Sequence, residues 1–193
     1  MKQIVLASGN PGKLAEFRTM LAGYKVISPK DLGVALDVEE TGETFYDNAL
    51  IKARALYELT GLPALADDSG LCVDALGGAP GVLSARYSGG SNKDNNAKLL
   101  NELAGMTDRK AHFECCIVCF DGRSVVSASG KTFGVITDAE RGNGGFGYDP
   151  LFLSDDLGKT FGEASETEKN RVSHRARALG TLADKIYEIF KER

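Results

Sequence analysis

The sequence LADDSG, at residues 65–70, determines how the rest of this chain is interpreted. An apolar run at residues 62–66 leads into two aspartates, a serine and a glycine, and such a run predicts a buried strand. Ligands of open α/β sheets bind at the carboxyl ends of strands. Because successive strand residues point to opposite faces, Asp67 and Asp68 should have different surroundings. A carboxylate placed there is either a metal ligand and base or only a cap for the following turn.

Length and composition narrow the class of protein. The 193 residues suffice for one sizeable core, so we expect a single domain over residues 1–193, built from two lobes. The formal net charge of −4 argues against general polyanion binding, so nucleic acid is not an expected partner. No apolar run approaches the roughly 18 residues of a membrane span, and the N-terminus lacks a signal-peptide pattern. We therefore expect no membrane association.

Four cysteines lie in apolar, strand-like segments rather than in a spaced framework. This placement predicts buried thiols in a reducing compartment, and hence a cytoplasmic protein. Cys116 and Cys119 have the spacing of a metal-binding pair, but the chain has no second pair to complete a closed zinc site. We interpret both as core residues.

The first motif is a glycine turn at residues 8–13, SGNPGK, between a predicted strand at 3–7 and a helix. Asn10 is a suitable N-cap and Pro11 suits the first helical position. Free backbone N–H groups and the positive end of the helix dipole favour phosphate there, and Lys13 would add a charge. The alternative is an ordinary strand-to-helix turn. The glycine spacing is too short for a Walker A loop.

An acidic turn at residues 37–43 precedes a predicted helix at residues 44–60, which Gly61 ends. Glu39 or Glu40 could share a cation with Asp68, although acids before a helix are more commonly solvated. Lys52 on this helix is a surface lysine by default, and it could also reach a phosphate.

The middle of the chain predicts a helix and a meander of strands. Ser91 and Asp94 resemble a capping box, which opens a helix that ends near Gly105. Strands are expected at residues 111–120, 124–128 and 131–136, the first two joined by a tight turn.

Two further motifs are suited to a ring-shaped ligand. The glycine-dense loop at residues 142–150 carries Phe146 and Tyr148, which could stack on a flat ring, and Asp149, which could accept from a ring N–H. The alternative is a hairpin loop whose aromatics cover the core edge. His174 and Arg175 stand near the start of an amphipathic helix, where cations oppose the dipole. They are either ligand-binding or simply solvated and salt-bridged.

These motifs together resemble the inosine/xanthosine triphosphate pyrophosphatase family. The resemblance rests on SGNPGK at 8–13, ADDSG at 66–70 with LGGAPG at 76–81, GFGYDP at 145–150 and SHR at 173–175. It implies an α/β fold with an elongated, strongly twisted mixed sheet flanked by helices, and two lobes around a central cleft. It also implies a homodimer and Mg²⁺-dependent cleavage of inosine, deoxyinosine and xanthosine triphosphates between the α- and β-phosphates.

The resemblance also implies roles by position. Asp68 is the catalytic carboxylate and a metal ligand, and Glu39 matches the second metal position better than its neighbour Glu40. The substrate-contacting positions are Ser8, Gly9, Asn10, Pro11, Gly12, Lys13, Lys52, Ser69, Phe146, Gly147, Tyr148, Asp149, Lys169, His174 and Arg175. Whether Asp68 takes the proton of the attacking water or only positions metal and water is left open.

Donors such as Arg175 suit the 6-keto oxygen of hypoxanthine or xanthine, whereas the 6-amino group of adenine would leave a buried donor unpaired. Guanine also has a 6-keto group, so its rejection needs a separate constraint. The Maf-like nucleotide pyrophosphatases are a rival family, disfavoured by the motifs at 145–150 and 173–175. A nucleotide sensor without chemistry would not require the acidic cluster.

Overall fold

The computed structural model describes the backbone of residues 2–191 and the side chains up to residue 186. Six strands form one sheet in the order β2-β1-β3-β4-β5-β6. The strands are β1 Lys2–Leu6, β2 Tyr24–Ile27, β3 Ala64–Val73, β4 Lys110–Phe120, β5 Val125–Ile136 and β6 Phe152–Ser154. The α-helices are α1 Pro11–Met20, α2 Phe45–Thr60, α3 Asn92–Glu102, α4 Glu166–Val172 and α5 His174–Lys191. Short 3-10 helices occur at η1 Lys30–Leu32, η2 Asp74–Leu76 and η3 Gly81–Arg86.

The sheet is mixed, which confirms the predicted α/β class. β1 pairs in parallel with both β2 and β3, and the contact with β3 joins Val5 to Ala64 and Leu6 to Leu65. β5 and β6 are antiparallel. The parallel pairs need crossover helices, and α1 and α2 supply them.

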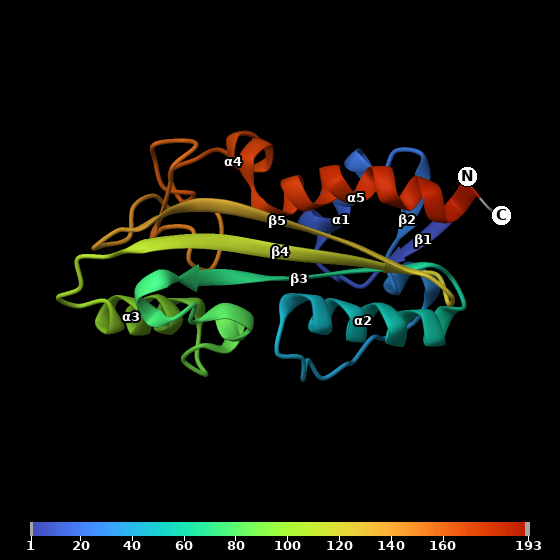
Figure 1. The fold of residues 1–193 in the computed structure, drawn as a ribbon, viewed down its shortest axis with the longest axis horizontal. Helices are drawn as coiled ribbons and strands as arrows, with labels where there is room; N and C mark the ends of the chain where they lie inside the picture. Colours follow the sequence, from blue (N-terminus) through green and yellow to red (C-terminus); the bar gives the residue numbers. More distant parts are fainter. Residues whose placement is uncertain (1, 192–193) are drawn as a thin grey trace. The chain divides into compact units, whose positions relative to one another are not determined.

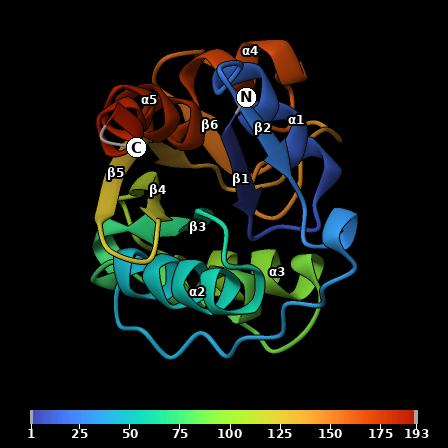
Figure 2. The ribbon, with the colours of Figure 1, turned by 90° about the vertical axis from the view of Figure 1, so that its right-hand side faces the viewer.

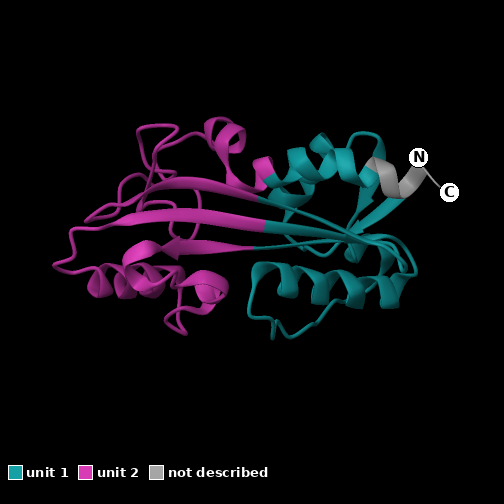
Figure 3. Cartoon of the chain, in the orientation of Figure 1, with its two compact units in different colours: residues 1–68, 116–129, 178–193 teal, residues 69–115, 130–177 magenta. Residues whose placement is uncertain are grey.

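The chain divides into two compact units, coloured separately in Figure 3. Unit 1 consists of residues 1–68, 116–129 and 178–193, and unit 2 consists of residues 69–115 and 130–177. The long strands β3, β4 and β5 each contribute residues to both units.

In unit 1, α1 and α5 lie on one face of the sheet and α2 on the other (Figures 1 and 2). The predicted helix start at Asn10 is confirmed, since its Oδ1 accepts from Gly12 N at 2.8 Å. α2 begins with a capping box between Thr44 and Asp47 and ends at Gly61 in the left-handed conformation. Part of the core beneath it consists of Val5, Ile27, Leu56 and Ala64.

In unit 2, α3 lies on one face of the sheet and α4 on the other (Figures 1 and 2). The capping box of Ser91 and Asp94 is present as predicted. The core of this unit is aromatic, and the Phe113 ring packs against those of Phe152 and Phe161 with centroids 4.7 and 6.0 Å apart.

Two predicted strand boundaries are wrong. The strand through LADDSG does not end before Asp67, because β3 continues to Val73 after its pairing with β1 ends at Leu65. The aspartates therefore lie inside β3, just past the carboxyl end of β1. The strands predicted at 124–128 and 131–136 are one strand, β5, because Gly130 lies buried within it rather than at a turn.

Burial of the thiols is confirmed for Cys115, Cys116 and Cys119. Cys72 is an exception, since its residue is only half-buried. Within the described residues, no helix is both long and apolar enough to cross a membrane.

Candidate functional site

The glycine turn after β1 is held by its own side chains. Ser8 Oγ accepts from Asn10 N at 3.1 Å, and Asn10 Oδ1 accepts from the N–H groups of Gly12 and Lys13 at 2.8 and 3.3 Å. Two of the backbone donors expected to hold phosphate are thus bonded to the cap. Gly9 and Pro11 are exposed, and a Cβ added to Gly9 would meet no atom within 4 Å.

The two aspartates of β3 have different partners, as strand alternation predicts. Asp67 is 2% exposed, and its Oδ2 forms an ion pair with Lys13 Nζ from α1 at 2.8 Å. Asp68 instead accepts a hydrogen bond from Asn48 Nδ2 at 3.1 Å. Lys52 Nζ, one turn further along α2, lies 3.6 Å from Asp68 Oδ1. Because α1 and α2 cover opposite faces, the two carboxylates serve opposite sides of the sheet.

The acidic turn before α2 is tied to Asp68 through two side chains. Glu40 Oε1 lies 2.6 Å from Lys52 Nζ, the same ammonium that approaches Asp68. Asn48 Oδ1 accepts from Gly42 N at 2.7 Å, while its Nδ2 donates to Asp68. Position 42 requires glycine, because a Cβ there would come within 2.7 Å of Asn48 Oδ1. Glu39 is exposed.

In unit 2, the glycine loop is organised around one buried carboxylate. Asp149 is 2% exposed, accepts from Phe146 N at 2.8 Å and forms an ion pair with Lys169 of α4. Lys169 Nζ also lies 4.7 Å from the centroid of the Phe146 ring. Gly145 has a φ of 71° and sits against Asp149, so a side chain there would clash with the carboxylate.

The two aromatic residues of this loop are placed differently. Phe146 is 61% exposed, with Lys169 Nζ over its ring. Tyr148 is buried in the core of unit 2, and its hydroxyl donates to the Ser84 carbonyl at 2.9 Å. This burial raises the pKa of the Tyr148 hydroxyl. The ring of Tyr148 therefore anchors the loop, which leaves Phe146 as the aromatic suited to stacking.

His174 and Arg175 occupy the first turn of α5, as predicted, and each is 7% exposed. Ser173 Oγ accepts from Ala176 N at 3.1 Å and so caps this turn. The His174 ring stacks on Phe113 at a centroid distance of 5.1 Å and an angle of 18°. The core of unit 2 thus fixes the imidazole. Ser69 is half-buried in β3.

Comparison with known proteins identifies the chain. The sequence model of the Ham1 family matches residues 4–185. The chain belongs to the Ham1 family. It is 54% identical to a dITP/XTP pyrophosphatase of Ralstonia nicotianae, covering 96% of this chain and 97% of that one. A dITP/XTP pyrophosphatase of Bacillus licheniformis is 48% identical, with 95% and 97% covered.

Solved structures of Ham1 proteins have the same fold. The Staphylococcus aureus Ham1 protein aligns with a TM-score of 0.91 and 41% identity, covering 97% of this chain and 99% of that one. A HAM1 protein from Coxiella burnetii has a TM-score of 0.91 and 42% identity, with 97% and 100% covered. The match spans both units.

Sequence reasoning missed one side chain that contacts Asp68 and one ion pair. The side chain is Asn48, which lies four residues before Lys52 and so shares a face of α2 with it. Its side chain is completely buried at 0% exposure, and a buried amide needs hydrogen-bond partners, which Gly42 and Asp68 supply. The Lys13–Asp67 ion pair was also missed, because the two residues are 54 positions apart in the chain.

Proposed function

We propose that this chain hydrolyses inosine, deoxyinosine and xanthosine triphosphates to the monophosphate and pyrophosphate. Family membership supports this, since relatives about half identical over nearly their full length carry the name dITP/XTP pyrophosphatase. The observation that carries the proposal is the different pairing of the two β3 aspartates. Lys13 neutralises Asp67, whereas Asp68 is held by the neutral amide of Asn48 and a more distant Lys52.

Asp68 and Glu39 are the residues we propose to hold Mg²⁺. Their carboxylate oxygens are the hard donors that Mg²⁺ takes, and it needs few of them when phosphates complete its shell. Glu40 already forms an ion pair with Lys52, while Glu39 is exposed and has no ion pair within the described part of the chain. When bound, Mg²⁺ offsets phosphate charge and lowers the pKa of a coordinated water.

The residues of unit 1 are proposed to act on the triphosphate. The ammonium groups of Lys13 and Lys52 can donate to phosphate oxygens as well as to their carboxylate partners, and the exposed turn at Gly9 allows close approach of an anion. Asp68 is proposed to orient the water that attacks the α-phosphorus and to accept its proton. The bond to the bridging oxygen then breaks, and pyrophosphate leaves.

The residues of unit 2 are proposed to recognise the purine base. Phe146 stacks on the purine. Lys169, which forms an ion pair with Asp149, lies over the Phe146 ring and holds that ring in place. Arg175 and His174 are fixed in the first turn of α5 and donate to the 6-keto oxygen. Adenine presents a donor there and leaves the pair unsatisfied, which costs affinity.

The deciding experiment measures products as well as rates. The purified chain with Mg²⁺ should release pyrophosphate from ITP, dITP and XTP far faster than from ATP or GTP. Release of orthophosphate, or equal rates on ATP, would remove the assignment. We further propose a cytoplasmic homodimer, for which light scattering after size exclusion should give twice the 20.6 kDa chain mass.

A further inference from the structure

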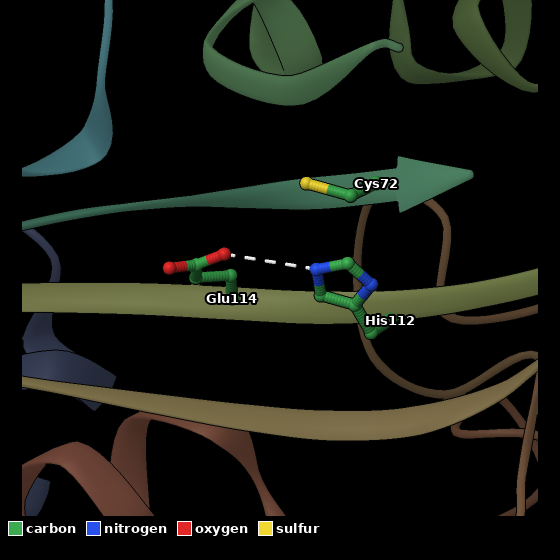
Figure 4. Close-up of side chains that lie close together, drawn as sticks. All are labelled: Cys72, His112 and Glu114. Carbon is green, nitrogen blue, oxygen red and sulfur yellow. Dashed lines mark ion pairs between the residues drawn. The ribbon is translucent and has the colours of Figure 1, made fainter. Parts of the chain in front are cut away.

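A second set of metal-ligating side chains lies in unit 2, apart from the residues assigned above. Cys72 of β3 and His112 and Glu114 of β4 each place one ligand atom within 4.8 Å of the others (Figure 4). His112 Nε2 is 3.6 Å from Glu114 Oε2. Residues 112 and 114 are two apart on one strand, so their side chains share a face. Cys72 is the one cysteine that the core does not bury.

The chemistry of these donors selects the metal. A thiolate, an imidazole and a carboxylate suit Zn²⁺, whereas Mg²⁺ prefers oxygen ligands. Metal–ligand bonds of a tetrahedral zinc site place neighbouring ligand atoms about 3.3–3.6 Å apart. The His112–Glu114 separation of 3.6 Å already meets that spacing. The remaining separations, at most 4.8 Å, require only side-chain adjustment of about 1 Å.

A metal ion can reach these side chains from solvent, and Lys131 competes with it for Glu114 and His112. The side chains of His112 and Glu114 are 17% and 23% exposed, so an ion can reach them from solvent. Lys131 Nζ of β5 lies 3.0 Å from Glu114 Oε2 and 3.4 Å from His112 Nε2. Its side chain is 43% exposed and can swing away. The ring of Phe133 packs beside His112 at a centroid distance of 5.6 Å, which limits imidazole rotation.

We propose that Cys72, His112 and Glu114 bind one Zn²⁺ ion, with water in the fourth position and Lys131 displaced. The ion would join the adjacent strands β3 and β4. Burial and the nearby Glu114 raise the pKa of the Cys72 thiol to about 11, so binding must release its proton to solvent. Unlike the Cys116–Cys119 spacing in the sequence, this set brings together three ligands from two strands, β3 and β4. The proposal is independent of the proposed function.

Cobalt(II) is a suitable probe because it replaces Zn²⁺ in tetrahedral sites and reports its ligands by colour. Titration of the full chain with Co²⁺ alone should give one equivalent of thiolate-to-metal charge-transfer absorption and intense visible bands, and Zn²⁺ should abolish both. Cobalt bound at Asp68 and Glu39 has only oxygen ligands and gives no such charge-transfer band. The two sites are therefore distinguishable in one spectrum.

Variants then test two of the ligands, Cys72 and His112, and the competing Lys131. Cys72→Ser should abolish the charge-transfer band, and His112→Gln should weaken Co²⁺ binding by about 100-fold. Lys131→Ala should tighten binding roughly threefold by removing the competing charge, whereas Lys110→Ala, a matched lysine change at the start of β4, should not. All four variants should keep the Mg²⁺-dependent turnover. A band that persists in Cys72→Ser, or affinity unchanged in both His112→Gln and Lys131→Ala, would overturn the proposal.

Discussion

Asn48 donates from Nδ2 to Asp68 Oδ2 at 3.1 Å, while its Oδ1 accepts from Gly42 N at 2.7 Å. One buried amide therefore links the acidic turn to the proposed catalytic carboxylate. Its amide end orients the carboxylate through a hydrogen bond and adds no charge, so Lys52 at 3.6 Å supplies the positive charge beside Asp68. The other end fixes the turn that carries Glu39 and Glu40.

Two replacements of Asn48 test its contacts with Gly42 and with Asp68. Asn48→Ala leaves Gly42 N without its partner, and unfolding in urea should show a loss of about 1–3 kcal/mol. Asn48→Asp keeps an acceptor for Gly42 but buries a second carboxylate against Asp68, so both kcat and the free energy of unfolding should fall. Equal kcat in wild type and Asn48→Asp would show that Asn48 has no part in positioning Asp68.

The two aspartates of β3 should respond differently to the same substitution. Asp68→Asn should abolish turnover and leave nucleotide binding largely intact, which calorimetry with ITP can measure. The Asp67 side chain is 1% exposed, and Asp67→Asn removes the charge that pairs with Lys13. The free energy of unfolding should therefore fall by about 2 kcal/mol. Lys13 is 23% exposed and partly solvated, which keeps this cost below that of a fully buried pair. Retained turnover in Asp68→Asn would exclude it as the catalytic residue.

Glu39 and Glu40 form a matched pair for testing the second metal ligand. Glu39→Gln should raise the Mg²⁺ concentration needed for half-maximal activity by about tenfold or more. Glu40→Gln should leave that concentration near the wild-type value, because Glu40 is engaged by Lys52 at 2.6 Å. The reverse outcome would assign the metal to Glu40.

Phe146 and Tyr148 should affect substrate binding and stability separately. Phe146→Ala removes an exposed ring, so stability should change by less than about 0.5 kcal/mol. Its KM for ITP should rise about tenfold, because aromatic stacking on a base contributes about 1–3 kcal/mol. Tyr148→Phe loses the hydrogen bond to Ser84 and should cost about 1 kcal/mol in stability with little change in KM. A KM unchanged by Phe146→Ala would argue against stacking.

Glu168, at the start of α4, should contribute to the loss of stability as the pH falls. A hydrogen bond from Lys159, and then those from Ser165, lower the pKa of Glu168 from 4.5 to about 2. A carboxyl with a depressed pKa in the folded state stabilises the fold above its unfolded pKa and loses that effect as pH falls. The stability difference between wild type and Glu168→Gln should therefore be full above about pH 5 and shrink toward pH 2. A difference that does not vary over this range would contradict the assignment.

Local sequence chemistry was enough to predict several elements of this fold. Asn10 and Pro11 mark the start of α1, Ser91 with Asp94 marks α3, and Gly61 ends α2, because caps depend on atoms within a few residues. Strand ends were predicted less well. The end of β3 depends on which neighbour it pairs with, and that information lies far away in the chain.

The sequence by itself determined the family and the motifs, because their residues are contiguous and their order along the chain is specific. It also predicted that Asp67 and Asp68 face opposite ways, since that follows from strand geometry. Only the tertiary structure decided that Lys13 pairs with Asp67 and that Asn48 holds Asp68. It also decided that Tyr148 is buried while Phe146 is exposed. Such pairings arise when packing brings distant elements together, and the energy of burying a polar group then selects its partner.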